Sequence, residues 1–81
     1  MPISSELASQ YQIDHSSLKE QTTDLLRDLI VSGRIPAGAK ITERDVAAML
    51  NISRMPARDA LMELERQGLV ISKPGGRYVI Q

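Results

Sequence analysis

The 81-residue sequence contains no cysteine, tryptophan or phenylalanine, and it has only two tyrosines and one histidine. The lack of cysteine excludes disulfides, thiolate zinc sites and cysteine nucleophiles. Two aromatic residues are too few for the stacking platforms that bind single-stranded nucleic acids. The longest apolar run, residues 46–50, is far too short for a membrane span or a signal peptide.

Enzymatic and metal-dependent functions find no support in the residues that remain. The single histidine, His15, has only Asp14 beside it in a polar segment, and no set of nucleophile, base and orienting group can be assembled. We therefore expect neither catalysis nor a cofactor. Because the length allows one small domain at most, the chain is expected to be a binding module or a piece of a larger protein.

The ten basic and ten acidic residues cancel, but they are unevenly distributed along the chain. Residues 1–28 hold two basic and five acidic residues, a formal charge of −3, whereas residues 29–81 hold eight basic and five acidic residues, a formal charge of +3. An asymmetry of this kind indicates a polyanionic partner. Because the excess of positive charge is modest, the positions of the individual cations have to decide whether the partner is a polyanion.

The N-terminal third predicts a flexible arm followed by one helix. Residues 1–16 are polar and serine-rich, without sustained periodicity, and predict an arm with one weak turn at most. A capping box then predicts that a helix begins at Ser17, because the Ser17 hydroxyl and the Glu20 carboxylate can satisfy free amide groups reciprocally. Leucine and isoleucine follow at helical spacing, and Gly33 is placed to end the helix. The folded domain is therefore expected to occupy residues 17–81.

Two shorter helices are predicted to follow, separated by a turn of about three residues. After a turn and a very short strand, Thr42 is positioned to cap the second helix. Asn51 suits the left-handed backbone of the tight turn, and Ser53 is positioned to cap the third helix. Pro56 falls in the first turn of that helix, where its missing amide costs no bond. This layout, at about residues 43–62, is typical of a helix-turn-helix.

The C-terminal part predicts a β-hairpin that follows directly on the third helix. Two short β-type runs are joined by a loop at residues 72–77, which carries Lys73 and Arg77. A hairpin in this place, at about residues 69–80, is a wing that can lay backbone and cations along a neighbouring minor groove. The expected fold is mainly α with a small β-hairpin, a winged helix-turn-helix. Its candidate core residues are Leu25, Leu26, Leu29, Ile30, Val46, Leu50, Leu61, Leu64, Val70 and Val79.

The outward face at the start of the third helix is the part of a helix-turn-helix that enters the major groove. Arg54 and Arg58 lie four residues apart and project from one face there. A guanidinium can pair bidentately with guanine O6 and N7, or it can hold a phosphate. Both arginines, and Arg44 in the second helix, stand at the helix end that the macrodipole makes unfavourable for a cation. This placement indicates a role beyond stability.

A simpler interpretation is a solvated face on which Arg54 or Arg58 pairs with a nearby carboxylate. The candidate partners are Glu43, Asp45 and Asp59. The helix-turn-helix spacing, together with the basic hairpin, favours the functional interpretation instead. On the same face, Met55 is a candidate for contact with the methyl group of a base.

Four segments, in this order, resemble the N-terminal winged helix of the GntR family of bacterial transcription regulators: RIPAG at 34–38, ITER at 41–44, SRMPARDAL at 53–61 and LERQGLV at 64–70. The resemblance extends from about Leu18 to Val79. The SRMPARDAL segment with a Gly-Gly wing points to the FadR-like rather than the HutC-like subgroup.

The resemblance implies specific roles at the matching positions. Arg44 and Arg54 would contact guanine edges, Ser53 and Arg58 would mostly hold phosphates, and the two wing glycines would approach the minor groove. Methionine at Met55, where threonine is common in the family, leaves open which bases the third helix reads. The full set of candidate DNA-binding residues is Thr42, Glu43, Arg44, Ser53, Arg54, Met55, Pro56, Arg58, Lys73, Gly75, Gly76 and Arg77.

The resemblance also implies a larger protein in the bacterial cytoplasm, associated with the nucleoid. Such regulators carry a C-terminal domain for effector binding and dimerisation, which is expected to be absent from this chain, so effector and metal residues cannot be carried over. The expected partner is a pseudo-palindromic operator in double-stranded DNA, bound by a homodimer, with no membrane involved. The alternative is a winged-helix protein-interaction module without a nucleic-acid partner, although such modules usually lack paired arginines at the start of the third helix.

Overall fold

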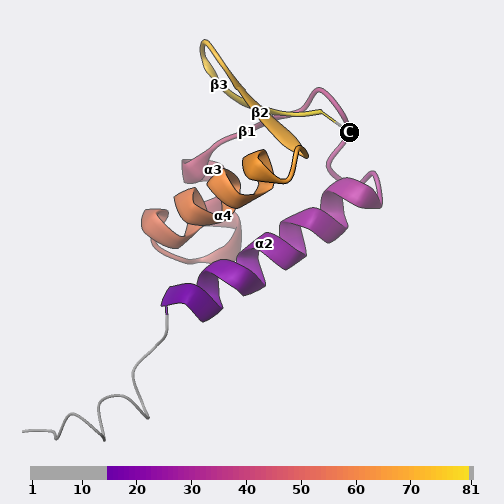
Figure 1. The fold of residues 1–81 in the computed structure, drawn as a ribbon. Coiled ribbons are helices and arrows are strands. Elements are labelled where there is room, and N and C mark those ends of the chain that lie inside the picture. The colour runs from indigo at the N-terminus through magenta and orange to yellow at the C-terminus, as the bar shows by residue number, and fades with distance from the viewer. Residues whose placement is uncertain (1–14, 81) are drawn as a thin grey trace, which may run out of the picture.

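The computed structural model describes residues 15–80, and the side chains of residues 17–80. Helices and strands follow one another as α2 (His15–Val31), β1 (Lys40–Ile41), α3 (Glu43–Leu50), α4 (Arg54–Arg66), β2 (Val70–Lys73) and β3 (Gly76–Val79). Helix α4 packs against both α2 and α3, and the hairpin of β2 and β3 projects beyond the helices (Figure 1). The fold is a winged helix, as predicted. Apart from its last two residues, which belong to α2, the predicted arm at 1–16 lies outside the described residues.

Helix α2 begins two residues earlier than the capping-box pattern predicts, so the prediction that Ser17 caps it is wrong. Ser17 lies inside the helix, where its hydroxyl accepts a hydrogen bond from Gln21 Nε2 at 3.3 Å. The end of the helix is as predicted. Gly33 follows it with a φ of 81°, and the amide of Ile35 donates to the carbonyl of Leu29 at 3.0 Å.

The predicted helix-turn-helix is confirmed, with one difference at the start of α4. Thr42 Oγ1 accepts a hydrogen bond from the amide of Asp45 at 3.0 Å, and so caps α3. Asn51 ends that helix with φ 53° and ψ 48°, in the left-handed region. Ser53 occupies the N-cap position of α4 with extended backbone, but its hydroxyl makes no capping hydrogen bond. The hydroxyl of Ser53 is therefore free to form a hydrogen bond outside the helix.

The sheet is antiparallel with the strand order β1–β3–β2, so the short strand β1 pairs with β3 at the edge opposite β2. The turn of the hairpin is shorter than the predicted loop at 72–77. Four of those six residues lie in strands, and only Pro74 and Gly75 turn the chain. Gly75 has a φ of 99°, a positive value that glycine adopts without steric cost. Because two residues suffice for the turn, the residues on either side of it pair across the two strands: Ser72 with Arg77 and Lys73 with Gly76.

The core lies between the three helices and the inner face of the sheet. Seven of the ten predicted core residues are buried, and Leu29 and Leu50 pack against them while partly exposed. Leu25 is the exception, because it is 42% exposed. Thr22 and Thr23 are buried on α2 instead, and Thr23 Oγ1 donates to the carbonyl four residues earlier at 2.7 Å. A threonine that satisfies its hydroxyl within its own helix can face the core, which leucine spacing alone does not reveal.

Candidate nucleic-acid interface

The first turns of α4 present three exposed side chains on one side. Arg54 and Arg58 are exposed, and Met55 between them is 68% exposed. Pro56 and Ala57 are buried on the opposite side of the helix and determine which face points outward. Pro56, predicted as a site residue, therefore supports the helix from within and does not present its side chain at this surface.

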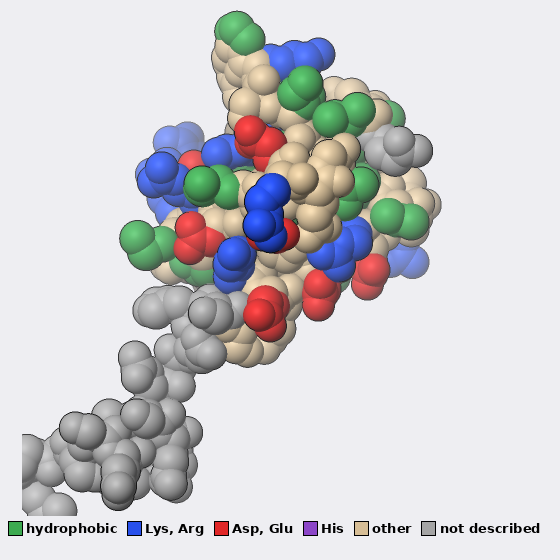
Figure 2. Space-filling model, in the orientation of Figure 1, with side chains coloured by type: hydrophobic (Ala, Val, Ile, Leu, Met, Phe, Trp, Pro, Cys, Tyr) green, Lys and Arg blue, Asp and Glu red, His purple; other side chains and the backbone are tan. Residues whose placement is uncertain are grey.

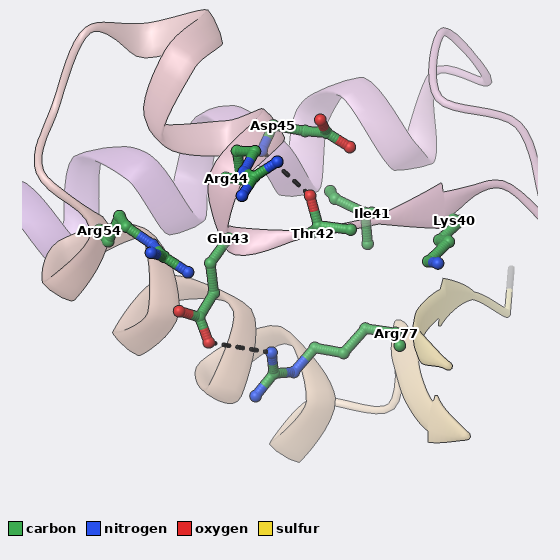
Figure 3. A pocket seen from close by; sticks show the side chains of 9 residues that line it. Lys40, Ile41, Thr42, Glu43, Arg44, Asp45, Arg54 and Arg77 are labelled. Carbon is green, nitrogen blue, oxygen red and sulfur yellow. Dashed lines mark hydrogen bonds and ion pairs between the residues drawn. The ribbon is translucent and has the colours of Figure 1, made fainter. Parts of the chain in front are cut away.

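A cleft of about 570 Å³ separates the start of the helix-turn-helix from the wing (Figure 3). Arg44 and Arg54 line it from the helices, and Lys40 and Arg77 line it from the sheet. Glu43, the first residue of α3, extends between Arg54 and Arg77 (Figure 3). The cleft thus brings four cations and two carboxylates, Glu43 and Asp45, together from segments distant in the sequence.

Sequence reasoning missed Lys40 as a member of this group. Lys40 is exposed, and in β1 it pairs with Tyr78 of β3, beside the wing. The available signal was its place next to Ile41 in a two-residue strand, because side chains alternate between the two faces of a strand. Ile41 is buried, so its neighbour has to point the other way.

The arginines at the helix starts have no carboxylate partner in the described part of the chain. Within residues 17–80, no ion pair of 4.0 Å or less involves Arg44, Arg54 or Arg58. The pairing with Glu43, Asp45 or Asp59 that the simpler interpretation allowed is therefore not observed within residues 17–80. Figure 2 shows basic side chains gathered on the side of the molecule where α3 and α4 begin, and another at the tip of the wing.

The wing presents one cation and two glycines. Lys73 Nζ lies 5.9 Å from the centre of the Tyr78 ring, a cation–π arrangement on the outer face of the hairpin. Gly76 has a φ of 145°, and a Cβ atom there would come within 2.9 Å of Lys40 Cε. Glycine at Gly76 therefore serves the backbone conformation, since the end of the flexible Lys40 side chain can move aside.

Arg77 is placed differently from the other predicted cations. Its Nε lies 3.3 Å from Glu65 Oε1 on α4, and its Nη1 lies 3.6 Å from Glu43 Oε2 on α3. Only 22% of its side chain is exposed. The structure thus directs Arg77 towards two carboxylates of the helices.

A second group of charges lies at the contact between α2 and α4. Glu63 accepts hydrogen bonds from Arg66 Nη2 at 2.8 Å and from Gln67 Nε2 at 3.0 Å, and Lys19 Nζ lies 3.8 Å away. The hydrogen bond from Arg66, followed by that from Gln67, holds the pKa of the Glu63 carboxyl below its usual value. On α2, Arg27 is paired with an aspartate in the same way. These cations are compensated within the fold.

Comparison with known proteins gives a family for this chain. The family model described as bacterial regulatory proteins, gntR family, matches residues 18–80. The chain belongs to the gntR family. The matched range contains all three strands and nearly all of the three helices, together with every candidate site residue.

Two curated relatives are similar in sequence over most of this chain. The probable D-xylose utilization operon transcriptional repressor of Paenarthrobacter nicotinovorans is 33% identical over 66 residues, which are 82% of this chain and 29% of that protein. The putative L-lactate dehydrogenase operon regulatory protein of Escherichia coli is 37% identical over 65 residues, 79% of this chain and 25% of that protein. The chain thus spans less than a third of the length of these relatives.

Solved structures of other proteins share the fold. A GntR family member from Pseudomonas syringae aligns with a TM-score of 0.76 and 30% identity over 86% of this chain and 30% of its own. The AraR DNA-binding domain in complex with operator ORX1 aligns with a TM-score of 0.68 and 28% identity, over 86% of this chain and 83% of its own.

No helix among residues 15–80 is long and apolar enough to cross a membrane.

Proposed function

We propose that this chain reads a specific sequence in double-stranded DNA, with α4 in the major groove and the wing at the adjacent minor groove. Membership of the gntR family and the operator-bound relative support DNA binding by a transcription regulator. The observation that carries the proposal is the group of three exposed arginines, Arg44, Arg54 and Arg58, which have no carboxylate partner within residues 17–80. Unpaired guanidinium groups on one surface offer the donors that guanine edges and phosphates accept.

The exposed residues of α3 and α4 divide into base contacts and phosphate contacts. Arg44 and Arg54, in the first turns of the two helices, are assigned to guanine edges. Arg58 lies one turn further along α4 and is assigned to a phosphate, as is Ser53, whose hydroxyl is free of a capping bond. Met55 is assigned to the methyl group of a thymine, because it is the apolar side chain exposed among these cations.

The wing supplies contacts beside those of α4. Lys73 is assigned to a phosphate, and the backbone at Gly75 and Gly76 is assigned to close approach at the minor groove. Thr42 and Glu43 border the same cleft and complete the proposed interface. Thr42 Oγ1 already accepts the capping bond of α3, so it has its proton left to donate to a phosphate.

The protein to which this domain belongs is proposed to be a metabolite-responsive regulator of the FadR-like subgroup. The SRMPARDAL segment and the Gly-Gly wing support that subgroup. A homodimer would bind a pseudo-palindromic operator, and effector binding elsewhere would change the spacing of its two winged helices. The isolated chain should bind one half-site weakly, because it lacks the gain in effective concentration that a linked pair has.

A titration of this chain against a random pool of duplex DNA at two salt concentrations, with sequencing of the retained DNA, tests the proposal. Enrichment of a short motif that contains guanine, with affinity that falls steeply as salt rises, is the expected result. Retention that depends on salt but yields no motif would reduce the arginines to phosphate contacts. The absence of retention even at low salt would contradict the proposal and favour the protein-interaction module.

A further inference from the structure

Arg77 connects the wing to both helices of the helix-turn-helix. From β3 it reaches Glu65 on α4 at 3.3 Å and Glu43 on α3 at 3.6 Å. Ser72 on β2 donates to the same Glu65 oxygen at 2.8 Å. Both strands of the hairpin are therefore tied to one carboxylate of α4, and Arg77 extends the connection to α3 (Figure 3).

The register of the sheet explains why Arg77 points inward. Arg77 pairs with Ile41, and two residues along β3 Val79 pairs with Val70. Directly opposed residues lie on one face of a sheet, and so do residues two apart in a strand. Because Ile41, Val70 and Val79 are all buried, Arg77 continues the core-facing row of the sheet beyond the end of the apolar core.

Lys73 provides the contrast within the same hairpin. It pairs with Gly76, one residue out of phase with Arg77, and so lies on the opposite face beside Tyr78. No ion pair within residues 17–80 involves Lys73. Lys73 and Arg77 are both basic residues of the wing, but within the same range Lys73 is without a carboxylate partner and Arg77 has two.

We infer that Arg77 is a positioning residue, which holds the wing at a set angle to α3 and α4 through Glu65 and Glu43 and does not itself contact DNA. The inference rests on the proposed function, because the angle matters only if helix and wing bind one duplex together. A wing that is already oriented does not have to be ordered when DNA binds, and this saving strengthens binding. Glu65 and Glu43 then favour DNA binding despite their negative charge.

The sign of the effect at Glu65 separates the positioning role from a phosphate contact. Glu65→Gln, Arg77→Met and the double variant are compared with the wild-type chain for binding to the selected DNA site, well below every unfolding temperature. Glu63→Gln is the matched control, since it removes another α4 carboxylate that faces α2 and not the wing. Thermal unfolding of each variant verifies that it is folded, so that a purely structural loss appears there and not in the affinity.

With positioning, Glu65→Gln and Arg77→Met each weaken binding by about threefold to tenfold. The double variant is no weaker than the weaker single variant, and Glu63→Gln binds as the wild type does or slightly better. If Arg77 instead contacts a phosphate, Glu65→Gln strengthens binding because it frees the guanidinium, and Arg77→Met weakens it, which overturns the inference. Wild-type affinity for Glu65→Gln also overturns it. Failure of the wild-type chain itself to bind any duplex overturns the proposed function together with this inference.

Hydroxyl-radical footprints add a measurement that stability alone does not change. Arg77→Met should lose protection on the flank next to the wing and retain it where α4 binds. Protection reduced evenly over the whole site would contradict a role in orienting the wing. The second variant, Glu65→Gln, gives the same readout if Arg77→Met does not fold.

Discussion

The basic residues at the starts of α3 and α4 differ from those at the contact between α2 and α4 and at the base of the wing. Arg44, Arg54 and Arg58 are exposed and, within residues 17–80, have no carboxylate within 4.0 Å. Along the contact between α2 and α4 and at the base of the wing, basic residues are paired. The paired residues are Lys19, Arg27, Arg66 and Arg77. We call these four paired residues the compensated side and the three arginines the uncompensated side; Arg34, Lys40 and Lys73 also have no ion pair within residues 17–80.

This difference indicates that ion pairing within the fold does not account for the cations at the helix starts. Arg66 stands in the last turn of α4, where the helix dipole favours a cation, and it has Glu63 as a partner. Arg54 stands in the first turn of the same helix, where the dipole disfavours it, and it has no such partner. Glu43, which lines the same cleft as Arg54, is paired with Arg77 instead. A bound polyanion would supply the missing partners.

The largest expected effect comes from removing an uncompensated arginine. Arg54→Ala should cost about 1–3 kcal/mol of binding free energy on the preferred site and relax specificity at one base pair, because a bidentate contact to guanine is lost. Titrations of the selected site and of its single-base variants measure both effects. Arg66→Ala, from the compensated side, is the matched control and should leave affinity unchanged. Equal losses on the selected site and on random DNA would contradict the assignment of Arg54 to a base.

A smaller and less selective effect is expected at the tip of the wing. Lys73→Ala should weaken binding to all sequences alike and reduce the slope of log affinity against log salt by about one unit, because one phosphate contact and its released counterion are lost. Titrations at four or more salt concentrations, on specific and random duplexes, give the slope. An unchanged slope would remove the phosphate contact from Lys73 and leave it as a partner of the Tyr78 ring alone.

A still smaller effect on DNA affinity is expected at Met55, and it is measured by changing the DNA. Met55 is exposed between two arginines, and contact with one thymine methyl group should contribute about 0.8 kcal/mol, or about fourfold in affinity. Replacing each thymine of the selected site by deoxyuridine, one position at a time, removes only that methyl. One position should respond in the wild type, and the same position should not respond in Met55→Ala. Sensitivity that persists in the variant would assign the methyl contact to another residue.

The sequence predicted the helix-turn-helix well because its signals there are local. The cap at Thr42, the left-handed Asn51 and the alanine-rich inner face of α4 each act within a few residues. It did not predict the inward direction of Arg77, which depends on a pairing with Ile41 across 36 positions of the chain. The buried position of Val79, two residues later in the strand, was the available signal, but it was not combined with the strand alternation.

The first helix illustrates a second limit of the sequence patterns. Leu25 fitted the apolar spacing yet is exposed, while Thr22 and Thr23 are buried. The orientation of α2 is set by its packing against α4, which no pattern within α2 can specify. Among the candidate site residues, the exposed positions of Arg54 and Met55 followed from their phase relative to the buried residues of α4. Their roles at DNA remain predictions.

The smallest expected effect lies on the compensated side and checks that its charges serve the fold. The hydrogen bond from Arg66 lowers the pKa of Glu63, so this pair stabilises the folded state above the unfolded pKa of the carboxyl, and that contribution is lost as the pH falls through the folded pKa. In Arg66→Ala the pKa of Glu63 should rise towards the ordinary glutamate value of about 4.5, which an NMR titration of the carboxyl carbon measures directly. The wild type should then lose slightly more stability than the variant as the pH falls from neutral through the folded pKa of Glu63. A matching change in DNA affinity at neutral pH would break the division between the two sides, because Arg66 would then act at the interface as well.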